Sequence, residues 1–260
     1  MSGKYTKTKA KKKKHLGLWI TLVLVLGVIL AALLLLPDDQ QEMPSTSQKP
    51  TLGGTQVFQQ EQNVYENQIN NLAIPVKDFL EIQTIGSYTG MYMEDGTDEI
   101  VTGVLMLKLA NNSKDTVEYA KIAMNIDGKT AEFTVTTLKP GDAVILLEKN
   151  RMTYDNAVDY TKAEFVCENL ALFQSPLSLH QDKFTFQILN GALNVTNISG
   201  EDIPGRITVY YKNKSNGLYY GGITYRVSLE EGLKAGEIRQ IMASHFAETG
   251  TEIVFVTIAQ

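Results

Sequence analysis

The side chains that most often carry out catalysis or bind metals are few in this chain. It contains three histidines, His15, His180 and His245, and a single cysteine, Cys167. No histidine stands at a metal-ligand spacing from the cysteine or from a carboxylate, so the sequence predicts no zinc site. Ser244 directly precedes His245, and adjacent residues on a strand point to opposite faces. We therefore do not expect this pair to act as nucleophile and base.

Two further candidates have structural explanations. Cys167 follows Phe165 and Val166 in an apolar strand pattern, where a cysteine is more often a small core residue than a nucleophile. The carboxylates of Glu94, Asp95, Asp98 and Glu99 could suggest calcium, but the segment lacks the ligand spacing of an EF-hand. A solvated hairpin turn is the favoured interpretation. We expect no cofactor, no metal and no catalytic residue.

Two tyrosines are the candidate ligand-binding residues. If Val209 and Tyr211 point into a core, alternation sends Tyr210 outward, and on the next strand Tyr219 points inward and Tyr220 outward. Cross-strand packing of exposed rings without a ligand is the favoured explanation. The alternative is a recognition surface, because tyrosine is enriched in binding sites.

A long apolar segment lies near the N-terminus of the chain. Residues 16–36 are 21 consecutive residues without a charge, which is long enough for a helix to cross a bilayer core of about 30 Å. A cleaved signal peptide is the alternative, but its apolar core is shorter and ends in a small-residue cleavage site, where this chain has Leu33 to Leu36. The segment therefore predicts an uncleaved single-pass anchor, with membrane lipid as its partner.

Charge on the two sides of this segment predicts its orientation. Seven lysines precede it, whereas Asp38, Asp39 and Glu42 follow it. By the positive-inside rule, residues 1–15 form a cytoplasmic tail and the C-terminal part lies outside the cell. The residues expected at the membrane interface are Lys11, Lys12, Lys13, Lys14 and Trp19.

Net charge excludes one class of partner. The chain carries −5, and without the seven N-terminal lysines 17 basic residues face 29 acidic ones, which is −12. Residues 16–260, which carry this negative charge, repel nucleic acid, so no nucleic-acid partner is expected. Residues 37–73 begin with a segment rich in Gln, Ser, Thr and Pro and predict a flexible stalk. Helical spacing of apolar residues between positions 61 and 73 predicts a short helix at its end.

From residue 74 the hydrophobic pattern changes to period two. Leu105, Leu107 and Leu109 are one example of an alternating, half-buried strand. Turn signals such as Asp127-Gly128 separate these strands. Short strands at this spacing predict a mainly β protein with antiparallel β-sandwich modules at 74–170 and 176–260. The step from Ser175 to Pro176 is the predicted boundary.

The second module repeats the first. Asn111 to Asp115 matches Asn197 to Glu201 at an offset of 86, and Leu138 to Asp142 matches Leu233 to Glu237 at an offset of 95. Each half also closes with an apolar strand, at 163–167 and at 253–258. The drift in offset is what longer hairpin loops in the second half would produce.

This repeated outline resembles a known class of modules. A strand ending in N-x-S, a turn with glycine and an L-x-P/A-G-D/E segment resemble bacterial extracytoplasmic immunoglobulin-like modules of the FxLYD type, mainly over residues 184–258. Tyr210-Tyr211-Lys212 stands where the family's own Phe-x-Leu-Tyr-Asp signature would end. The resemblance implies an immunoglobulin-like fold outside the cytoplasm and no assigned catalysis.

These observations predict a non-enzymatic, membrane-anchored binding or scaffold protein of a bacterial envelope, expected to be Gram-positive. Another envelope protein or a cell-wall component is the expected partner. The alternative is an accessory subunit of an envelope transport, secretion or conjugation machine. An ectoenzyme is the least favoured interpretation, because the chain has few histidines and one cysteine to supply a catalytic site.

Overall fold

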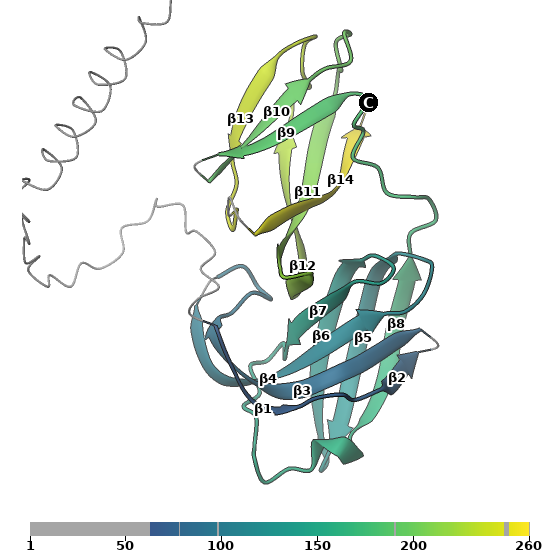
Figure 1. Ribbon diagram of the computed structural model, residues 1–260, viewed down its shortest axis with the longest axis vertical. Coiled ribbons are helices and arrows are strands. Elements are labelled where there is room, and N and C mark those ends of the chain that lie inside the picture. The colour runs from purple at the N-terminus through teal and green to yellow at the C-terminus, as the bar shows by residue number, and fades with distance from the viewer. Residues whose placement is uncertain (1–62, 78, 98, 190, 247–249, 260) are drawn as a thin grey trace, which may run out of the picture. The chain divides into compact units, whose positions relative to one another are not determined.

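The computed structural model describes residues 63–77, 79–97, 99–189, 191–246 and 250–259, all of which belong to one compact unit, Gly53–Gln260. Within these ranges the chain is built almost entirely from β-strands (Figure 1). No helix there is long and apolar enough to span a bilayer. The predicted anchor at 16–36 and the predicted interface residues Lys11, Lys12, Lys13, Lys14 and Trp19 lie outside the described residues.

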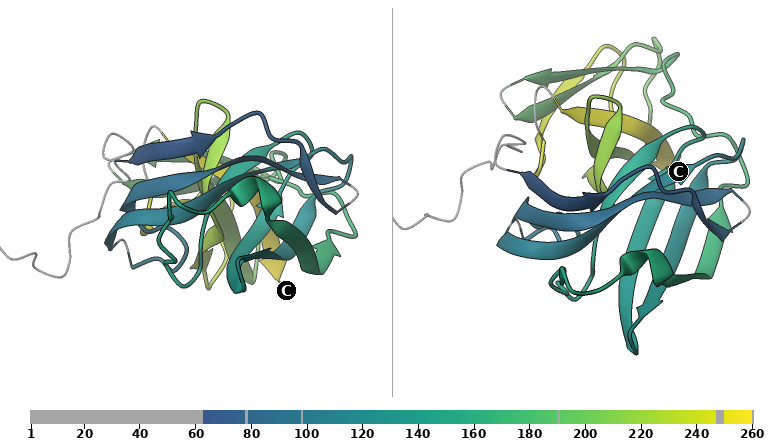
Figure 2. Two further views of the ribbon diagram at one scale, coloured as in Figure 1. Left: turned by 90° about the horizontal axis from the view of Figure 1, so that it is seen from below. Right: turned by 60° about the horizontal axis from the view of Figure 1, so that its bottom comes forward.

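The first eight strands form a sandwich, here called the first module. One layer contains β1, β2, β3, β4 and β7, and the other has the order β6-β5-β8. The two layers cross, as the blue and teal strands show in Figure 2. Their facing side chains, such as Leu107 and Phe133, are fully buried in one core. The strands are β1 (Val64–Ile69), β2 (Ile74–Lys77), β3 (Leu80–Met91), β4 (Ile100–Asn111), β5 (Val117–Ile126), β6 (Lys129–Leu138), β7 (Ala143–Leu147) and β8 (Glu164–Leu172), with a 3-10 turn, η2, at Tyr160–Lys162.

The last six strands form a second sandwich, the second module. One layer has the order β13-β10-β9, and the other contains β12, β11 and β14. Val209 and Tyr211 point into its core, as predicted, together with Leu193 and Phe246. The strands are β9 (Phe184–Leu189), β10 (Ala192–Asn197), β11 (Arg206–Ser215), β12 (Leu218–Leu229), β13 (Ile238–Met242) and β14 (Thr251–Ala259).

One sheet runs through both modules. The start of β12 pairs in parallel with β7, and Tyr219 lies opposite Val144 in this register. The resulting order is β1-β3-β4-β7-β12-β11-β14, with β2 paired to β3. The side chain of Tyr219, although it belongs to the second module, is buried in the core of the first.

Local turn chemistry explains two of the hairpins. Asp127 and Gly128 join β5 to β6, and Asn216 and Gly217 join β11 to β12, all four with φ between 48° and 79°. Asn, Asp and Gly tolerate this left-handed region better than other residues, and two such residues in succession match the twist of antiparallel strands. The turn predicted at Asp127-Gly128 is confirmed.

The internal repeat is confirmed by equivalent hydrogen bonds. The side-chain amide of Asn111 donates to the carbonyls of Asp115 and Leu138. Asn197, at the offset of 86, donates to the carbonyls of Glu201 and Leu233. In each copy the serine two residues later donates its hydroxyl back to the asparagine oxygen at 2.7 Å. The N-x-S pattern therefore builds the turn after β4 and after β10.

The short helix predicted between 61 and 73 is wrong where the structure describes this segment. Val64–Ile69 is strand β1, which pairs with the edge of β3, with Tyr65 opposite Tyr88. Burial of the Tyr65 ring against Tyr88, at a centroid distance of 5.4 Å, favours the strand over the helix that local spacing predicted.

Candidate functional site

Polar side chains gather at the junction where β12 meets β6 and β7. The carboxylate of Glu94, which lies after β3, accepts the backbone N–H of Leu147 at 2.9 Å. It also accepts the N–H of Gly222, with its two oxygens 3.0 and 2.9 Å from that nitrogen. One carboxylate of the first module therefore holds the backbone of both paired strands.

A lysine from the second module completes the junction. Lys212 is fully buried, and its Nζ donates to the carbonyls of Thr136 at 2.9 Å and Gly222 at 3.0 Å. The register of β11 against β12 shifts between Tyr211 and Asn213, so Lys212 lies at a bulge. A bulge redirects a side chain, which explains how a lysine in an apolar strand reaches the first module.

Gly222 is required sterically at the centre of the junction. A Cβ built on this residue would lie 1.8 Å from the carbonyl oxygen of Thr134 in β6. No side chain larger than hydrogen fits this approach. The hydroxyls of Thr136 and Thr224 lie 2.9 Å apart beside it and add a further link between β6 and β12.

Burial changes the proton affinity of both charged groups. Desolvation raises the pKa of Glu94 to about 7, against the lowering effect of the Leu147 and Gly222 N–H groups. Desolvation lowers the pKa of Lys212 to about 7, against the opposing effect of the Glu94 charge. The two groups are linked through the backbone of Gly222, which donates to one and accepts from the other.

The junction is suited to fastening strands. Both oxygens of Glu94 already accept N–H bonds, so the carboxylate is committed to the backbone. Among the described residues, no three His, Cys, Asp or Glu side chains are placed to hold a metal ion. The arrangement fixes β12 of the second module against the first.

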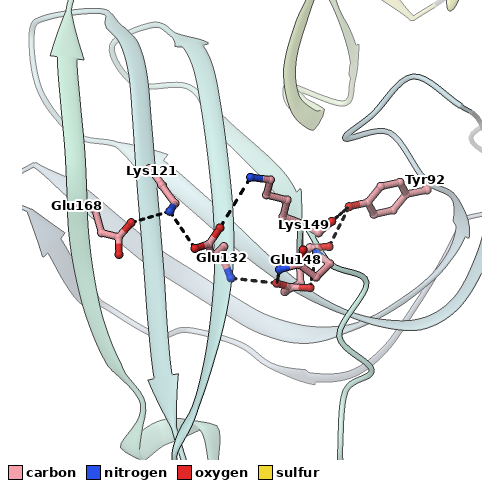
Figure 3. Close-up of polar contacts among 7 residues, drawn as sticks. Tyr92, Lys121, Glu132, Glu148, Lys149 and Glu168 are labelled. Carbon is pink, nitrogen blue, oxygen red and sulfur yellow. Dashed lines mark hydrogen bonds and ion pairs between the residues drawn. The ribbon is translucent and has the colours of Figure 1, made fainter.

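A buried carboxylate supports the segment that carries Glu94. Glu148 is fully buried, and its oxygens accept the N–H groups of Glu132, Asn150 and Met152. Tyr92, two residues before Glu94, donates its hydroxyl to the carbonyls of Glu148 and Lys149 (Figure 3). Tyr92 lies just before Glu94 in the chain, and Glu148 directly follows Leu147, which donates its N–H to Glu94. The contacts of Tyr92 and Glu148 therefore fix both segments that this hydrogen bond joins.

The acidic segment predicted to be a solvated turn divides into two parts. Asp95 and Glu99 are exposed and form ion pairs with Arg151, whose guanidinium also lies over the Tyr92 ring at 4.6 Å. Glu94 does not fit that prediction, because its carboxylate points into the junction. Sequence position alone does not distinguish these carboxylates.

The two predicted ligand-binding tyrosines are not brought together. Tyr220 is 6% exposed and packs in a cluster with Tyr88 and Val104, so its predicted outward orientation is wrong. The reason is the pairing of β12 with β7, which makes the start of β12 part of the first module's sheet. One face of that sheet packs on the first core, which includes Tyr219, and the other carries the cluster that includes Tyr220. Tyr210 is half-buried and stacks on Phe255 at a centroid distance of 4.1 Å. Their role in ligand binding stays a prediction, without the shared outer face that motivated it.

Other predicted features take structural roles. Cys167 is half-buried against the core of the first module, and burial raises the pKa of its thiol. The asparagines of three N-x-S patterns, Asn111, Asn197 and Asn213, are almost completely buried.

Comparison of the chain with protein-family models, with curated proteins and with solved structures finds no match. The resemblance to FxLYD-type modules therefore stays a prediction. What the structure shows is the coarser class, a mainly β protein of two sandwich-like layered modules joined through one sheet.

Sequence reasoning missed the junction, although one signal was present. Gly221 and Gly222 are consecutive glycines inside a long strand, which is a pattern typical of a close backbone approach. Lys212 follows an apolar run in β11, but nothing in the sequence identifies Glu94 as its neighbour.

Proposed function

We propose that this chain is a membrane-anchored, non-enzymatic binding or scaffold protein of a bacterial cell envelope, with both modules outside the membrane. The anchor is residues 16–36 and the N-terminal lysines lie in the cytoplasm. Another envelope protein or a cell-wall component is the partner, and a Gram-positive envelope is the setting.

The observation that carries the scaffold part of this proposal is the junction. Two modules joined only by a linker would reorient freely, whereas the β7–β12 pairing and the contacts of Glu94 and of the buried Lys212 fasten these two. Buried, satisfied polar contacts between sheets favour one arrangement over others. Two modules fastened in this way suit a scaffold, because their binding surfaces keep a fixed spacing.

The anchor and its orientation are tested by protease accessibility. The full chain carries one epitope tag at each end and is expressed in bacteria from which the wall has been removed. External protease is expected to remove the C-terminal tag and to leave the N-terminal tag on a short membrane-bound fragment. Extraction of the intact chain by alkaline carbonate would contradict the anchor.

A matched variant tests the reason for the orientation. Replacing Lys11, Lys12, Lys13 and Lys14 with glutamine removes most of the positive charge beside the apolar segment. A larger share of chains with a protected C-terminal tag is expected, because lysines near the segment set its direction. Unchanged accessibility in this variant would show that another feature determines the topology.

The proposed binding of an envelope partner is tested by photo-cross-linking of the full chain in its native envelope. Photoreactive residues are placed on the surface of the second module. Recovery of one defined envelope protein or wall fragment supports the proposal. Turnover of a substrate by the purified full chain would instead favour the ectoenzyme.

A further inference from the structure

An opening lies where the segment between β8 and β9 leaves the first module. Its volume is about 470 Å³, which is within the usual size of small-ligand sites. The lining comes from the turns that follow β4 and β6, from residues 173–179, and from Val254 of β14. We call this opening the linker pocket. It is separate from the junction, because neither Glu94 nor Lys212 lines it.

The backbone of the linker is fixed on either side of the pocket. Phe173 donates its N–H to the carbonyl of Thr116 at 3.0 Å, and Val256 of β14 donates its N–H to the carbonyl of Ser178 at 2.8 Å. The first contact ties the linker to the first module, and the second ties it to the second module. The pocket is therefore bounded by fixed backbone, as preformed ligand sites are.

The internal repeat identifies the equivalent place in the second module. Val117 pairs with Leu138 in the first module, and Ile203 pairs with Leu233 in the second. The two pairs are related by the offsets of 86 and 95 found in the sequence. The turns that flank these pairs can therefore be compared residue by residue.

In the second module a hydrogen bond joins the two turns. The carboxylate of Asp202 accepts the N–H of Ala235 at 2.9 Å. The corresponding residues of the first module are Thr116 and Pro140, and proline has no N–H to donate. The same bond cannot form there, and both residues line the pocket instead.

Apolar side chains make up one part of the lining. Phe173 and Leu177 are half-buried against the core of the first module, and Val254 is 2% exposed. The ring of Phe173 packs edge-on against Phe255 at a centroid distance of 5.6 Å, which fixes its position. These side chains favour a ligand with an apolar group.

Lys114 supplies an uncommitted positive charge. It is exposed, and its ammonium group forms no ion pair or hydrogen bond with any other described residue. The second lysine of the lining, Lys139, is bonded to Glu252 at 3.0 Å. Asp115 is the one carboxylate of the lining, and it is exposed to solvent. One cation is therefore left for a ligand, and an anion complements it.

Backbone donors in the linker are also uncommitted. The N–H groups of Gln174, Ser175 and Leu177 donate to no acceptor within the part of the chain that the structure describes. All three residues line the pocket. These groups can donate to carbonyl or carboxylate oxygens of a ligand.

We propose that the linker pocket binds the C-terminal residue of a peptide, with its carboxylate beside Lys114 and its apolar side chain between Phe173 and Val254. Such a residue carries an anion, a carbonyl acceptor and an apolar group within a few bonds of one another. These groups complement the free cation, the N–H donors and the apolar lining. The inference rests on the binding part of the proposed function and specifies the partner as a protein or peptide with a free C-terminus.

Ligand-observed NMR of the full chain in lipid nanodiscs tests the proposal. The probe is the acetylated tripeptide Gly-Gly-Leu with a free carboxylate, and empty nanodiscs supply the blank. Saturation transfer from the protein to the leucine methyl groups is expected, because these groups lie in the apolar part of the pocket. The C-terminal amide of the same tripeptide is expected to bind about five-fold more weakly, the upper range for one exposed ion pair. Acetylated Gly-Gly-Gly, which lacks the apolar side chain, is expected to show no saturable binding.

Two substitutions with opposite expected effects locate the carboxylate. Lys114→Gln should weaken binding of the free carboxylate about five-fold and leave binding of the amide unchanged. Asp115→Asn should strengthen binding of the free carboxylate about two-fold, because it removes a like charge from the lining. Lys129→Gln, at an exposed position on β6 outside the pocket, is the matched control and should change neither.

A double variant transfers the hydrogen bond of the second module to the first. Thr116→Asp combined with Pro140→Ala reproduces the pair formed by Asp202 and Ala235. It is expected to abolish saturable binding of the tripeptide without lowering the temperature of thermal unfolding, because it adds a hydrogen bond between the turns. Pro140→Ala alone lacks the carboxylate and should retain binding.

Four outcomes would overturn the proposal: no saturable binding of the tripeptide, equal binding of its amide, or binding unchanged by Lys114→Gln or by the double variant. Tighter binding of octanoate or of a chitin oligosaccharide would exclude a peptide as the ligand. Failure of this test removes the site and leaves an envelope partner to be found by photo-cross-linking. Failure of the cross-linking, with peptide binding intact, would count against the envelope partner alone.

Discussion

At the residue scale, Glu94 and Lys212 are two ionisable side chains that meet at the contact between the modules. Each is held by backbone groups, and the burial that shifts their pKa values also makes their charged forms costly. These two groups should therefore contribute to the pH dependence of stability.

The variant Glu94→Gln tests that dependence. In the folded state the pKa of Glu94 is about 7, whereas its ordinary value, which applies to the unfolded chain, is 4.5. Folding therefore takes up a proton on Glu94 when the pH lies between 4.5 and about 7. Wild-type stability from this group is full below pH 4.5 and is lost as pH rises to about 7. Glutamine lacks this linkage, so the stability of Glu94→Gln relative to wild type should rise by about 2–3 kcal/mol between pH 4.5 and 8.

Urea unfolding of both proteins at several pH values measures this difference. Glu118→Gln, the same substitution at an exposed position on β5, is the matched control. A constant difference between wild type and Glu94→Gln across this range would mean that Glu94 is not desolvated as described.

The repeated asparagine gives a second prediction. Asn197→Ala should lower the free energy of unfolding by about 2–4 kcal/mol, because the buried side-chain amide satisfies the carbonyls of Leu233, Lys234 and Glu201, of which that of Leu233 is buried. Asn112→Ala, at an exposed neighbour of the equivalent Asn111, should change it by less than about 0.5 kcal/mol. Thermal unfolding of the two variants compares them, and equal losses would count against a structural role for the N-x-S motif.

At the element scale, β12 is the strand that joins the modules. Its first residues pair with β7, its centre lies against β6, and its length pairs with β11. One strand thereby serves two sandwiches, and its close approach to β6 depends on Gly222.

The variant Gly222→Ala should separate β12 from β6. The added methyl would overlap the Thr134 carbonyl, and overpacking of this kind costs about 3 kcal/mol. Gly217→Ala adds the same methyl into open space at a φ of 79°, where only backbone strain of about 1 kcal/mol is expected. Calorimetry should show two unfolding transitions for Gly222→Ala and one for Gly217→Ala. A single, equally shifted transition in both would exclude the steric explanation.

At the scale of the whole molecule, the shared sheet predicts cooperative folding. The segment Gly53–Gln260, the compact unit that contains every described residue, should be soluble and give a β-rich circular dichroism spectrum. It should unfold in one transition, because the β7–β12 pairing and the junction couple the two cores. A mainly helical spectrum, or two independent transitions in the unmodified segment, would contradict this.

The sequence by itself determined the local part of this fold. Period-two alternation identified β-strands, because one face of each strand packs on a core. Asp127-Gly128 and Asn216-Gly217 fixed two hairpins, because turn type depends on the few residues that tolerate positive φ. The repeated N-x-S motif was visible for the same reason, since its hydrogen bonds reach mostly across a few residues.

Only the tertiary structure decided which strands meet across the modules. Alternation placed Tyr220 outside, but a strand that pairs with another module has no solvent face at that point. Glu94 and Gly222 are 128 residues apart in the chain, so no local pattern relates them. Their contact follows from the packing of two sheets. Burial at this contact depends on every surrounding element, and it sets the pKa values of Glu94 and Lys212.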